Sequence, residues 1–414
     1  MSPEALPREW SWRVLQDIGK IVTGNTPSTS EPAFWGGSIP FVTPTDLGQS
    51  AVVSSTGRSL SNEGAARARL LPPRSVLVTC IASIGKNALA STSCCTNQQI
   101  NAVVCNESAW PEYIYYGLCY RTAELQRIAG ATAVSIVSKG KFEQFGLPLP
   151  PLPEQRKIAA ILSSVDEAIE GTQAVIDQLQ VVKKAMMADL LTRGIPGRHK
   201  KFKITEIGEL PEDWEVVPVE RWLRLLIDYR GKSPPKAASG IPLITAKNVR
   251  EGFINADPRE FISADSFDAW MTRGLPDPGD VLFTTEAPLG KVALVPKTKI
   301  ALGQRLVTLC PQRDHLDPTY LMWVLMAPAF QDLLRSKATG STVQGIKQSV
   351  FRTLPIPIPP LDEQVVIARV LLSVADQASA ESACLDLLRT AKSALMAVLL
   401  TGEVRVRVAG ESAV

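Results

Sequence analysis

Apolar residues between Pro150 and Thr192 recur at alternating spacings of four and three. This heptad pattern places them along one face of an α-helix and is typical of a helix that packs lengthwise against another. After Pro153 no proline interrupts the segment, so we expect one continuous helix of about 40 residues, about 60 Å long at ~1.5 Å per residue. The predicted seam consists of Ile158, Leu162, Val165, Ile169, Ile176, Leu179 and Leu190.

The same segment occurs a second time, 209 residues further along the chain. Without a gap, 20 of the 43 positions from Pro150 to Thr192 are identical to those from Pro359 to Thr401. Each copy opens with Pro-Pro-Leu-x-Glu-Gln, and a proline pair cannot continue a preceding helix. Two unrelated surface helices would explain the periodicity but not the shared sequence, so we expect the two helices to pair. The second seam consists of Ile367, Leu371, Val374, Leu385, Leu388, Leu395 and Leu399.

The stretches that precede the two helices also resemble each other, at nearly the same offset. Val76–Thr79 and Lys86 match Val281–Thr284 and Lys291, and the pattern predicts a hairpin of two short strands around a turn. We therefore predict an α+β fold, in which two similar mixed α/β domains are separated by two long helices. The predicted order is a domain at 1–149, a central helix at 150–194, a second domain at 195–358, and a helix with a tail at 359–414.

The composition is that of an ordinary chain folded in water, with 45% hydrophobic and 21% charged residues among 414. Charge or proline breaks every apolar run well short of the ~20 residues that a membrane helix needs. The first residues lack a basic start followed by an apolar core, so the sequence predicts no signal peptide and a cytoplasmic protein. Its seven cysteines form no C-x-x-C pair, which favours reduced thiols.

The net charge of +3 is unevenly distributed along the chain. Residues 1–149 carry 12 basic and 10 acidic side chains, and residues 195–357 carry 22 and 18. The helical segments are slightly acidic, with 5 basic against 6 acidic side chains in 150–194 and 5 against 7 in 358–414. The positive excess therefore lies on the globular stretches, where phosphates could be bound, although a few charges are a modest signal.

Motifs that would indicate catalysis are incomplete. The segment Gly340–Lys347 resembles a phosphate-binding loop, but its lysine is displaced by one position and no Ser or Thr follows. The acidic residues within 277–291 lack the compact spacing of a nuclease metal site. The two histidines, His199 and His315, are expected in solvated loops. The sequence therefore predicts no catalytic residue, no metal and no cofactor.

The repeated order of variable domain and long helix, opening on Pro-Pro-Leu-x-Glu-Gln and closing on Leu-Leu-Thr, resembles the specificity subunits of type I restriction-modification enzymes over essentially the whole chain. The resemblance implies two target-recognition domains spaced by an antiparallel coiled coil. Each domain would read one half of a split, non-palindromic site in double-stranded DNA, while the helices set the gap and bind two methyltransferase subunits. Endonuclease subunits would join the same assembly, and adenine methylation and cleavage would belong to these partners. A rod of about 60 Å covers between one and two turns of B-DNA at ~34 Å each, which suits separated half-sites.

Candidate DNA contacts are polar side chains at turns beside predicted strands. Lys, Arg and hydroxyl groups bind phosphates, and Asn, Gln or Arg can pair with base edges in the major groove. The best base-reading groups are Asn97-Gln98-Gln99, Lys247-Asn248 and Gln304-Arg305. The first domain contributes Asn25, Thr26, Ser28, Thr43, Thr45, Lys86, Asn97, Gln98, Gln99 and Lys139. The second domain contributes Arg230, Lys232, Ser233, Lys236, Lys247, Asn248, Arg250, Lys291, Gln304, Arg305 and Lys347.

Two other functions stay open at the level of sequence. The chain could be the recognition portion of a fused methyltransferase-nuclease, although we expect a cofactor-binding sequence upstream in that case and none precedes the first domain. It could also be a coiled-coil adaptor that binds proteins and no DNA. Sequence-selective DNA binding by the complex with methyltransferase subunits would separate the adaptor from a specificity subunit.

Overall fold

The computed structural model describes residues 6–129, 135–229, 234–340 and 344–406. The chain divides into two compact units. Unit 1 comprises Met1–Ala174 with Ser382–Val414, and unit 2 comprises Val175–Glu381.

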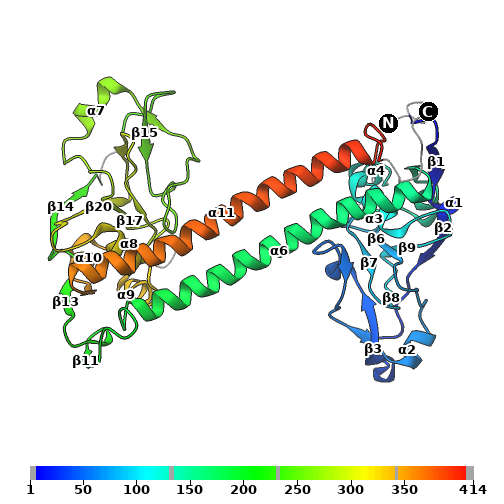
Figure 1. Cartoon of the computed structure of the whole chain (residues 1–414), viewed down its shortest axis with the longest axis horizontal. Helices are drawn as coiled ribbons and strands as arrows, with labels where there is room; N and C mark the ends of the chain where they lie inside the picture. The colour runs from blue at the N-terminus through cyan, green and yellow to red at the C-terminus, as the bar shows by residue number, and fades with distance from the viewer. Residues whose placement is uncertain (1–5, 130–134, 230–233, 341–343, 407–414) are drawn as a thin grey trace. The chain divides into compact units, whose positions relative to one another are not determined.

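The boundaries between the units fall inside the two long helices, α6 (Leu152–Leu190) and α11 (Leu361–Leu399). Each unit therefore contains one globular domain and a part of each long helix (Figure 1). The predicted fold class, two similar mixed α/β domains with two long helices, is confirmed. The division into four consecutive segments stays a prediction, because the compact units cut across the helices.

The domain of unit 1 is built on a five-stranded sheet in the order β2-β9-β6-β7-β4 and a three-stranded sheet in the order β5-β3-β8. A separate pair, β1 with β10, joins the two ends of the domain in antiparallel register. The strands are β1 (Ser11–Val14), β2 (Gly19–Thr23), β3 (Trp35–Val42), β4 (Val52–Val53), β5 (Ser59–Leu60), β6 (Val76–Thr79), β7 (Asn87–Ala90), β8 (Cys95–Thr96), β9 (Ile100–Cys105) and β10 (Gly146–Leu149). The helices are α1 (Leu15–Ile18), α2 (Asn62–Ala66), α3 (Pro111–Tyr120), α4 (Thr122–Arg127) and α5 (Lys139–Glu143), with single 3-10 turns at Pro32–Phe34 and Pro44–Asp46.

The domain of unit 2 repeats this plan with a sheet in the order β14-β20-β17-β18, a sheet in the order β16-β15-β19, and the pair β13 with β21. A hairpin of β11 with β12 is added at its start. The strands are β11 (Phe202–Thr205), β12 (Gly208–Pro211), β13 (Glu215–Pro218), β14 (Leu223–Asp228), β15 (Ile241–Ile244), β16 (Phe261–Ile262), β17 (Val281–Thr284), β18 (Val292–Leu294), β19 (Ala301–Leu302), β20 (Leu306–Pro311) and β21 (Pro355–Ile358). The helices are α7 (Ala264–Trp270), α8 (Pro318–Met326), α9 (Pro328–Lys337) and α10 (Gln348–Arg352).

The central strand of each domain is buried on both faces, which explains its run of apolar residues. Side chains alternate between the faces of a strand. In β6, Val76 and Val78 join the core that includes α3, whereas Leu77 joins the core on the opposite face. In the equivalent strand β17, Leu282 likewise faces away from the core that contains its neighbours. The predicted hairpin is therefore confirmed in both domains, as β6 with β7 and as β17 with β18.

The two long helices pack in opposite directions within each unit. In unit 1 the first turns of α6 share a core with the last turns of α11, through Ile158 and Leu399. In unit 2 the last turns of α6 share a core with the first turns of α11, through Leu190 and Ile367. All fourteen predicted seam side chains are buried or half-buried. Each helix ends shortly before a glycine with positive φ, Gly194 at 73° or Gly402 at 77°, which is a common way to stop a helix.

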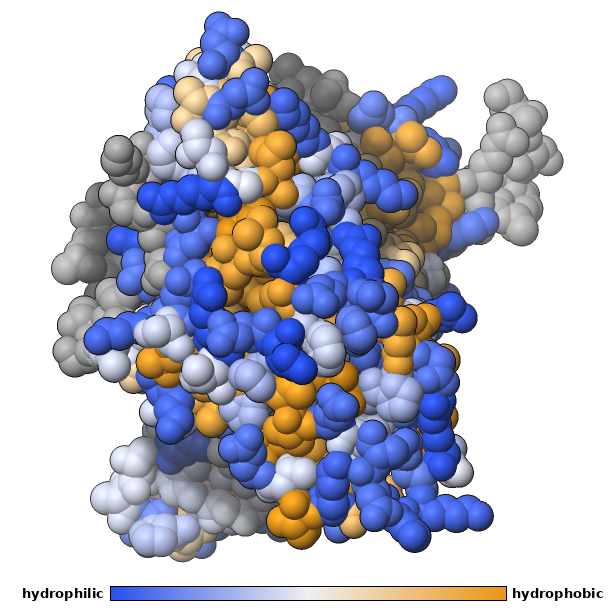
Figure 2. Space-filling view, turned by 90° about the vertical axis from the view of Figure 1, so that its left-hand side faces the viewer, coloured by the Kyte–Doolittle hydropathy of each residue, from blue (hydrophilic) through white to orange (hydrophobic). Residues whose placement is uncertain are grey.

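The surface of unit 2 that Figure 2 shows is a mixture of charged, polar and apolar side chains, in which apolar patches lie between hydrophilic ones. Such a mixture is normal for a protein surface in water. Among the described residues, no helix combines the length and the apolar character that crossing a membrane requires.

Candidate nucleic-acid interface

The loops that follow β2, β3 and β8 meet in the domain of unit 1. The backbone N–H of Gly24 donates to Ile100 O (3.0 Å), and that of Asn97 donates to Val42 O (3.2 Å). The side chain of Thr26 donates to Gln98 Oε1 (2.8 Å), which fixes the glutamine against the first of these loops. Most candidate contacts of the first domain are therefore neighbours in space, although they come from separate parts of the sequence.

Within this loop cluster, Gln98 is the candidate whose amide reaches solvent. Asn97 donates through Nδ2 to Gln99 Oε1 (3.0 Å), and Asn97 Oδ1 accepts from the backbone N–H of Gln99 (3.1 Å). Both side chains are half-buried, whereas Gln98 is exposed. Asn25 is also half-buried and donates to Arg67 O (2.9 Å). The geometry thus favours Gln98 as the base reader of this set.

Three hydroxyl candidates lie at the edge of the same cluster. Thr43 caps the short turn Pro44–Asp46, where its backbone N–H and its hydroxyl both donate to Asp46 Oδ2 (2.7 Å each). Thr45 is exposed and lies within hydrogen-bonding distance of Thr43 Oγ1 (2.8 Å). Ser28 is exposed and pairs with Ser30 (2.8 Å). The Thr43 hydroxyl already donates to Asp46, so the exposed hydroxyls of Thr45 and Ser28 are the ones in this set that suit a phosphate contact.

The turn between the hairpin strands is the same in both domains and presents a lysine at the same place. The backbone N–H of Thr79 donates to Lys86 O, and the backbone N–H of the preceding glycine donates to Thr79 O (2.9 Å each). The Thr79 hydroxyl accepts from the Lys86 N–H (3.0 Å). Thr284 and Lys291 repeat each of these contacts, with 2.8 Å for the hydroxyl bond. The glycine before each lysine has a positive φ, 91° at position 85 and 81° at position 290, which side chains other than glycine rarely adopt. The repeat therefore preserves a lysine-bearing turn.

The two lysines differ in their ion pairs. Lys291 Nζ lies 2.5 Å from Glu251 Oε1, and this hydrogen bond lowers the pKa of Glu251. Lys86 is exposed, and no carboxylate among the described residues pairs with it. A phosphate can thus bind Lys86 without displacing a protein partner, whereas binding at Lys291 competes with Glu251.

Asn248 has a structural part in unit 2. Its Oδ1 accepts from the backbone N–H and the hydroxyl of Thr245 (3.0 Å each), and its Nδ2 donates to Asn255 O (3.1 Å) and Pro258 O (3.0 Å). The side chain is only 2% exposed. This turn repeats the one that Asp46 closes in unit 1. Because both ends of this amide already bond within the domain, Asn248 is poorly placed to pair with a base.

We expect Asn248→Ala to lower the free energy of unfolding of unit 2 by about 1–3 kcal/mol, because it leaves buried donors and acceptors of the turn without partners. Urea unfolding of the full chain measures this change. The ratio of specific to random DNA binding should stay the same for the folded fraction, and a loss of that ratio would show that Asn248 reads bases.

The other candidates of unit 2 lie on several loops. Lys247 follows β15 and is exposed, Arg250 donates to Val249 O (3.2 Å), and Gln304 and Arg305 precede β20. Arg305 pairs with Glu286 (3.0 Å), and Lys236 pairs with Glu260 (2.7 Å). Lys347 is exposed beside the first turn of α10.

The remaining candidates are one lysine of unit 1 and three residues of unit 2. In unit 1, Lys139 pairs with Glu143 (3.4 Å) on α5. Arg230, Lys232 and Ser233 lie outside the described residues.

Sequence reasoning missed what the Glu-Gln pair of each helix opening does. Gln155 accepts from the Trp110 N–H (2.7 Å) and donates to Ser108 O and Pro150 O. Gln364 makes the equivalent bonds to Asp317 N, His315 O and Pro359 O. Each glutamine thus ties a long helix to its own domain. The signal was present in the sequence, because Glu-Gln is identical in the two openings while the next two positions, Arg156 and Lys157, are replaced by Val365 and Val366.

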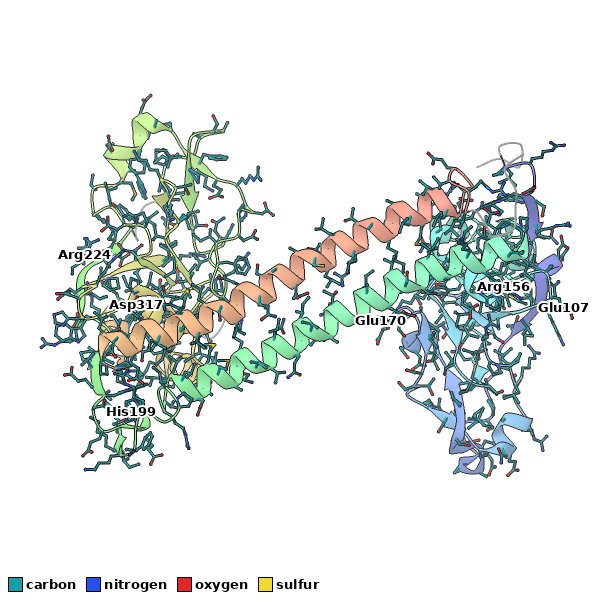
Figure 3. The ribbon with its side chains drawn as sticks, in the orientation of Figure 1. Glu107, Arg156, Glu170, His199, Arg224 and Asp317 are labelled. Carbon is teal, nitrogen blue, oxygen red and sulfur yellow. The ribbon has the colours of Figure 1, made fainter. Side chains whose placement is uncertain are left out.

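The glutamate at the start of each long helix accepts hydrogen bonds from a tryptophan indole and from a residue that follows the end of the other long helix. Glu154 accepts from Trp10 Nε1 (3.1 Å) and from Arg405, whose Nε lies 2.8 Å from Oε1. Glu363 accepts from Trp214 Nε1 (3.2 Å) and lies 2.8 Å from His199 Nε2 (Figure 3 labels His199). The expectation of a solvated His199 is therefore wrong, since its side chain is 5% exposed between Glu363 and Asp213.

The acidic residues considered for a nuclease site stabilise the fold instead. Asp280 is buried and accepts from the backbone N–H of Asp277 (2.9 Å). Arg224 and Arg313 approach it at 3.4 and 3.5 Å. Two arginines compensate the buried carboxylate, as a buried charge requires. In the parts of the chain that the structure describes, no cluster of three His, Cys, Asp or Glu side chains could hold a metal ion.

Two copies of one mixed α/β domain, each with polar loops beside a lysine-bearing turn and each anchored to two long helices, define a recognition scaffold with two related binding units. The family profile described as "Type I restriction modification DNA specificity domain" matches residues 7–181 and 227–383. The chain therefore belongs to the family of type I restriction-modification specificity subunits, as its sequence resemblance predicted.

Individual relatives agree with this assignment. The chain is similar to the type I restriction enzyme MjaVIII specificity subunit of Methanocaldococcus jannaschii, with 29% identity over 78% of this chain and 76% of the relative. It is also similar to the MjaIX specificity subunit of the same organism, with 23% identity over 97% and 95%. The crystal structure of a type I restriction-modification S subunit from M. genitalium shares the fold, with a TM-score of 0.64, 12% identity, and 97% and 99% of the two chains covered.

Proposed function

We propose that each unit of this chain reads one half of a bipartite, non-palindromic site in double-stranded DNA. The observation that carries the proposal is the repeated geometry of the polar loops. In both domains the loop after β3 or its equivalent β15 is hydrogen-bonded to the loop after β8 or β19 (Asn97 N to Val42 O, 3.2 Å; Gly303 N to Ile244 O, 2.7 Å), next to the same lysine-bearing turn. Gln98 and Gln304 are equivalent, but Asn97 and Gln99 of unit 1 are replaced by Gly303 and Arg305 in unit 2. A shared frame with different side chains suits two related readers of different sequences.

We further propose that the helices set the gap between the half-sites and bind two methyltransferase subunits, and that endonuclease subunits join the same complex. Methylation and cleavage would then belong to the partners, and this chain would contribute no catalytic group. The family assignment supports this division, as does the use of the buried acid Asp280 in structural ion pairs.

The proposal is tested by purifying the full chain with its methyltransferase partners and mapping the methylated positions on genomic DNA. We expect one motif with two defined halves separated by a gap of constant length. A continuous motif, or methylation without sequence preference, would contradict the bipartite reading, and the second result is the one that a protein-binding adaptor predicts.

A chimera assigns the halves to the units. Residues 7–149 are replaced by the matching domain of a relative with a different specificity, and a second chimera replaces 215–358. Each chimera should change one half of the motif and keep the other. If one exchange altered both halves, the units would not read independently.

A further inference from the structure

A groove of about 1020 Å³ lies within unit 1, between the globular domain and the helical segments that belong to the same unit. One wall is the β6–β7 turn with Lys86, and a second is α4 with Gln126. The opposite wall consists of Glu170 on α6 and Arg389 on α11 (Figure 3 labels Glu170). The groove therefore extends from the lysine-bearing turn, whose Lys86 is a candidate phosphate contact, to the helices.

One ion pair at the floor of the groove is already compensated. Lys392 Nζ lies 2.5 Å from Asp166 Oδ1, and the Tyr116 hydroxyl donates to Asp166 Oδ2 (2.8 Å). The side chains of Lys392 and Asp166 are only 23% and 14% exposed, so neither is open to a large ligand. This pair holds the helices together and leaves the binding chemistry to the rim.

The rim of the groove carries two accessible cations. Lys86 is exposed and forms no ion pair within the described part of the chain. Arg389 is 57% exposed, and its partner Asp386 lies 3.7 Å away on the same helix, a weak surface contact. Glu170 is the acidic side chain that opposes them. Ser83 and Ser135 add hydroxyl groups that can donate to a phosphate. Gln126 Nε2 and Ser393 Oγ also line the groove but already donate to Ile84 O and Arg389 O (3.0 Å each).

The equivalent place in unit 2 is built differently. Lys291, the counterpart of Lys86, is held by Glu251 at 2.5 Å. Lys183 is the repeat counterpart of Lys392, and it too lowers the pKa of Glu251. The counterpart of Asp166 is Ala375, which cannot form the ion pair seen in unit 1. The arrangement of two accessible cations on facing walls is therefore particular to unit 1.

We propose that this groove holds the sugar–phosphate backbone of the DNA next to the half-site read by unit 1, with Lys86 and Arg389 each contacting a phosphate. The inference rests on the proposed function and deepens it, because it makes the helix α11 a part of the DNA interface. Phosphate contacts carry no sequence information. Their effect is to fix the position of the domain on the duplex.

The test measures how the affinity of the complex with methyltransferase subunits for its own site depends on salt concentration. Each phosphate contact contributes about 0.9 to the slope of log affinity against log salt, so Lys86→Ala and Arg389→Ala should each flatten the slope by about 0.9. The preference for the specific site over random DNA should stay unchanged. Glu170→Gln should strengthen binding, a gain that damage to the fold would not produce. Arg369→Ala, an exposed arginine of the same helix outside the groove lining, is the matched control and should keep the slope of the unmodified chain.

Unchanged slopes for both cation variants would overturn the inference. It would also be overturned if Arg389→Ala weakened assembly with the methyltransferase subunits while the slope stayed the same, because the groove would then hold a protein segment. A failure of the proposed function looks different, since the unmodified complex itself would show no preference for any DNA sequence.

Discussion

Replacing Glu363 by alanine is expected to lower the free energy of unfolding of unit 2 by about 3–5 kcal/mol, because it removes one partner of a buried charged network. Trp214 Nε1, His199 Nε2 and the backbone N–H of Ile195 all donate to this carboxylate, and the residue is 0% exposed. In the variant all three donors would lose the carboxylate that accepts their hydrogen bonds. Urea unfolding, followed by tryptophan fluorescence, measures the change.

Asp362→Ala is the matched control. Asp362 is the neighbouring acid and pairs with Arg198 at 2.8 Å, but its side chain is 68% exposed. Solvent screens an exposed pair, so the loss of stability should be much smaller than for Glu363→Ala. Equal losses for the two variants would show that burial of Glu363 does not determine its contribution.

Gln98→Ala is expected to reduce the discrimination of the complex for its own half-site by about 10- to 100-fold, which corresponds to the ~1–3 kcal/mol of one good pairing with a base edge. The side chain is exposed and oriented by Thr26. Competition binding measures the effect, with one duplex that carries the full motif and one in which the half-site of unit 1 is replaced.

The control for Gln98 is Gln144→Ala. Gln144 is an exposed glutamine that donates to Gln16 (3.1 Å), away from the loop cluster. It should leave both affinities unchanged. If Gln98→Ala weakened binding to both duplexes equally, the side chain would support general DNA binding and would not read a base.

The fold was predictable because the same pattern occurs twice in the chain, so each copy supports the interpretation of the other. Heptad spacing alone fits many helices, but two copies that share most of their seam residues, such as Ile158 with Ile367 and Leu162 with Leu371, favour helices that pair with each other. The hairpin was predictable for the same reason, since a glycine and a lysine recur at the same distance from a strand of buried residues.

The parts that were not predictable depend on contacts between distant segments. Asn248 has the same side chain as a base reader, and only the positions of Asn255 and Pro258 show that its amide is used inside the domain. The linker around His199 is polar and rich in Gly and Pro, which indicates a solvated loop. Its burial follows from Glu363, which lies 164 residues further along the chain.

The composition of the units also bears on how the protein is synthesised. All residues of unit 2 lie in one continuous stretch, Val175–Glu381, whereas unit 1 needs Ser382–Val414 in addition to its first 174 residues. A ribosome has therefore completed every residue of unit 2 before it makes Met396, Leu399 and Arg405, which complete the core and the buried carboxylate contacts of unit 1. Domains usually fold from the amino terminus onward during synthesis. In this chain the unit that begins first is the one whose chain is finished last.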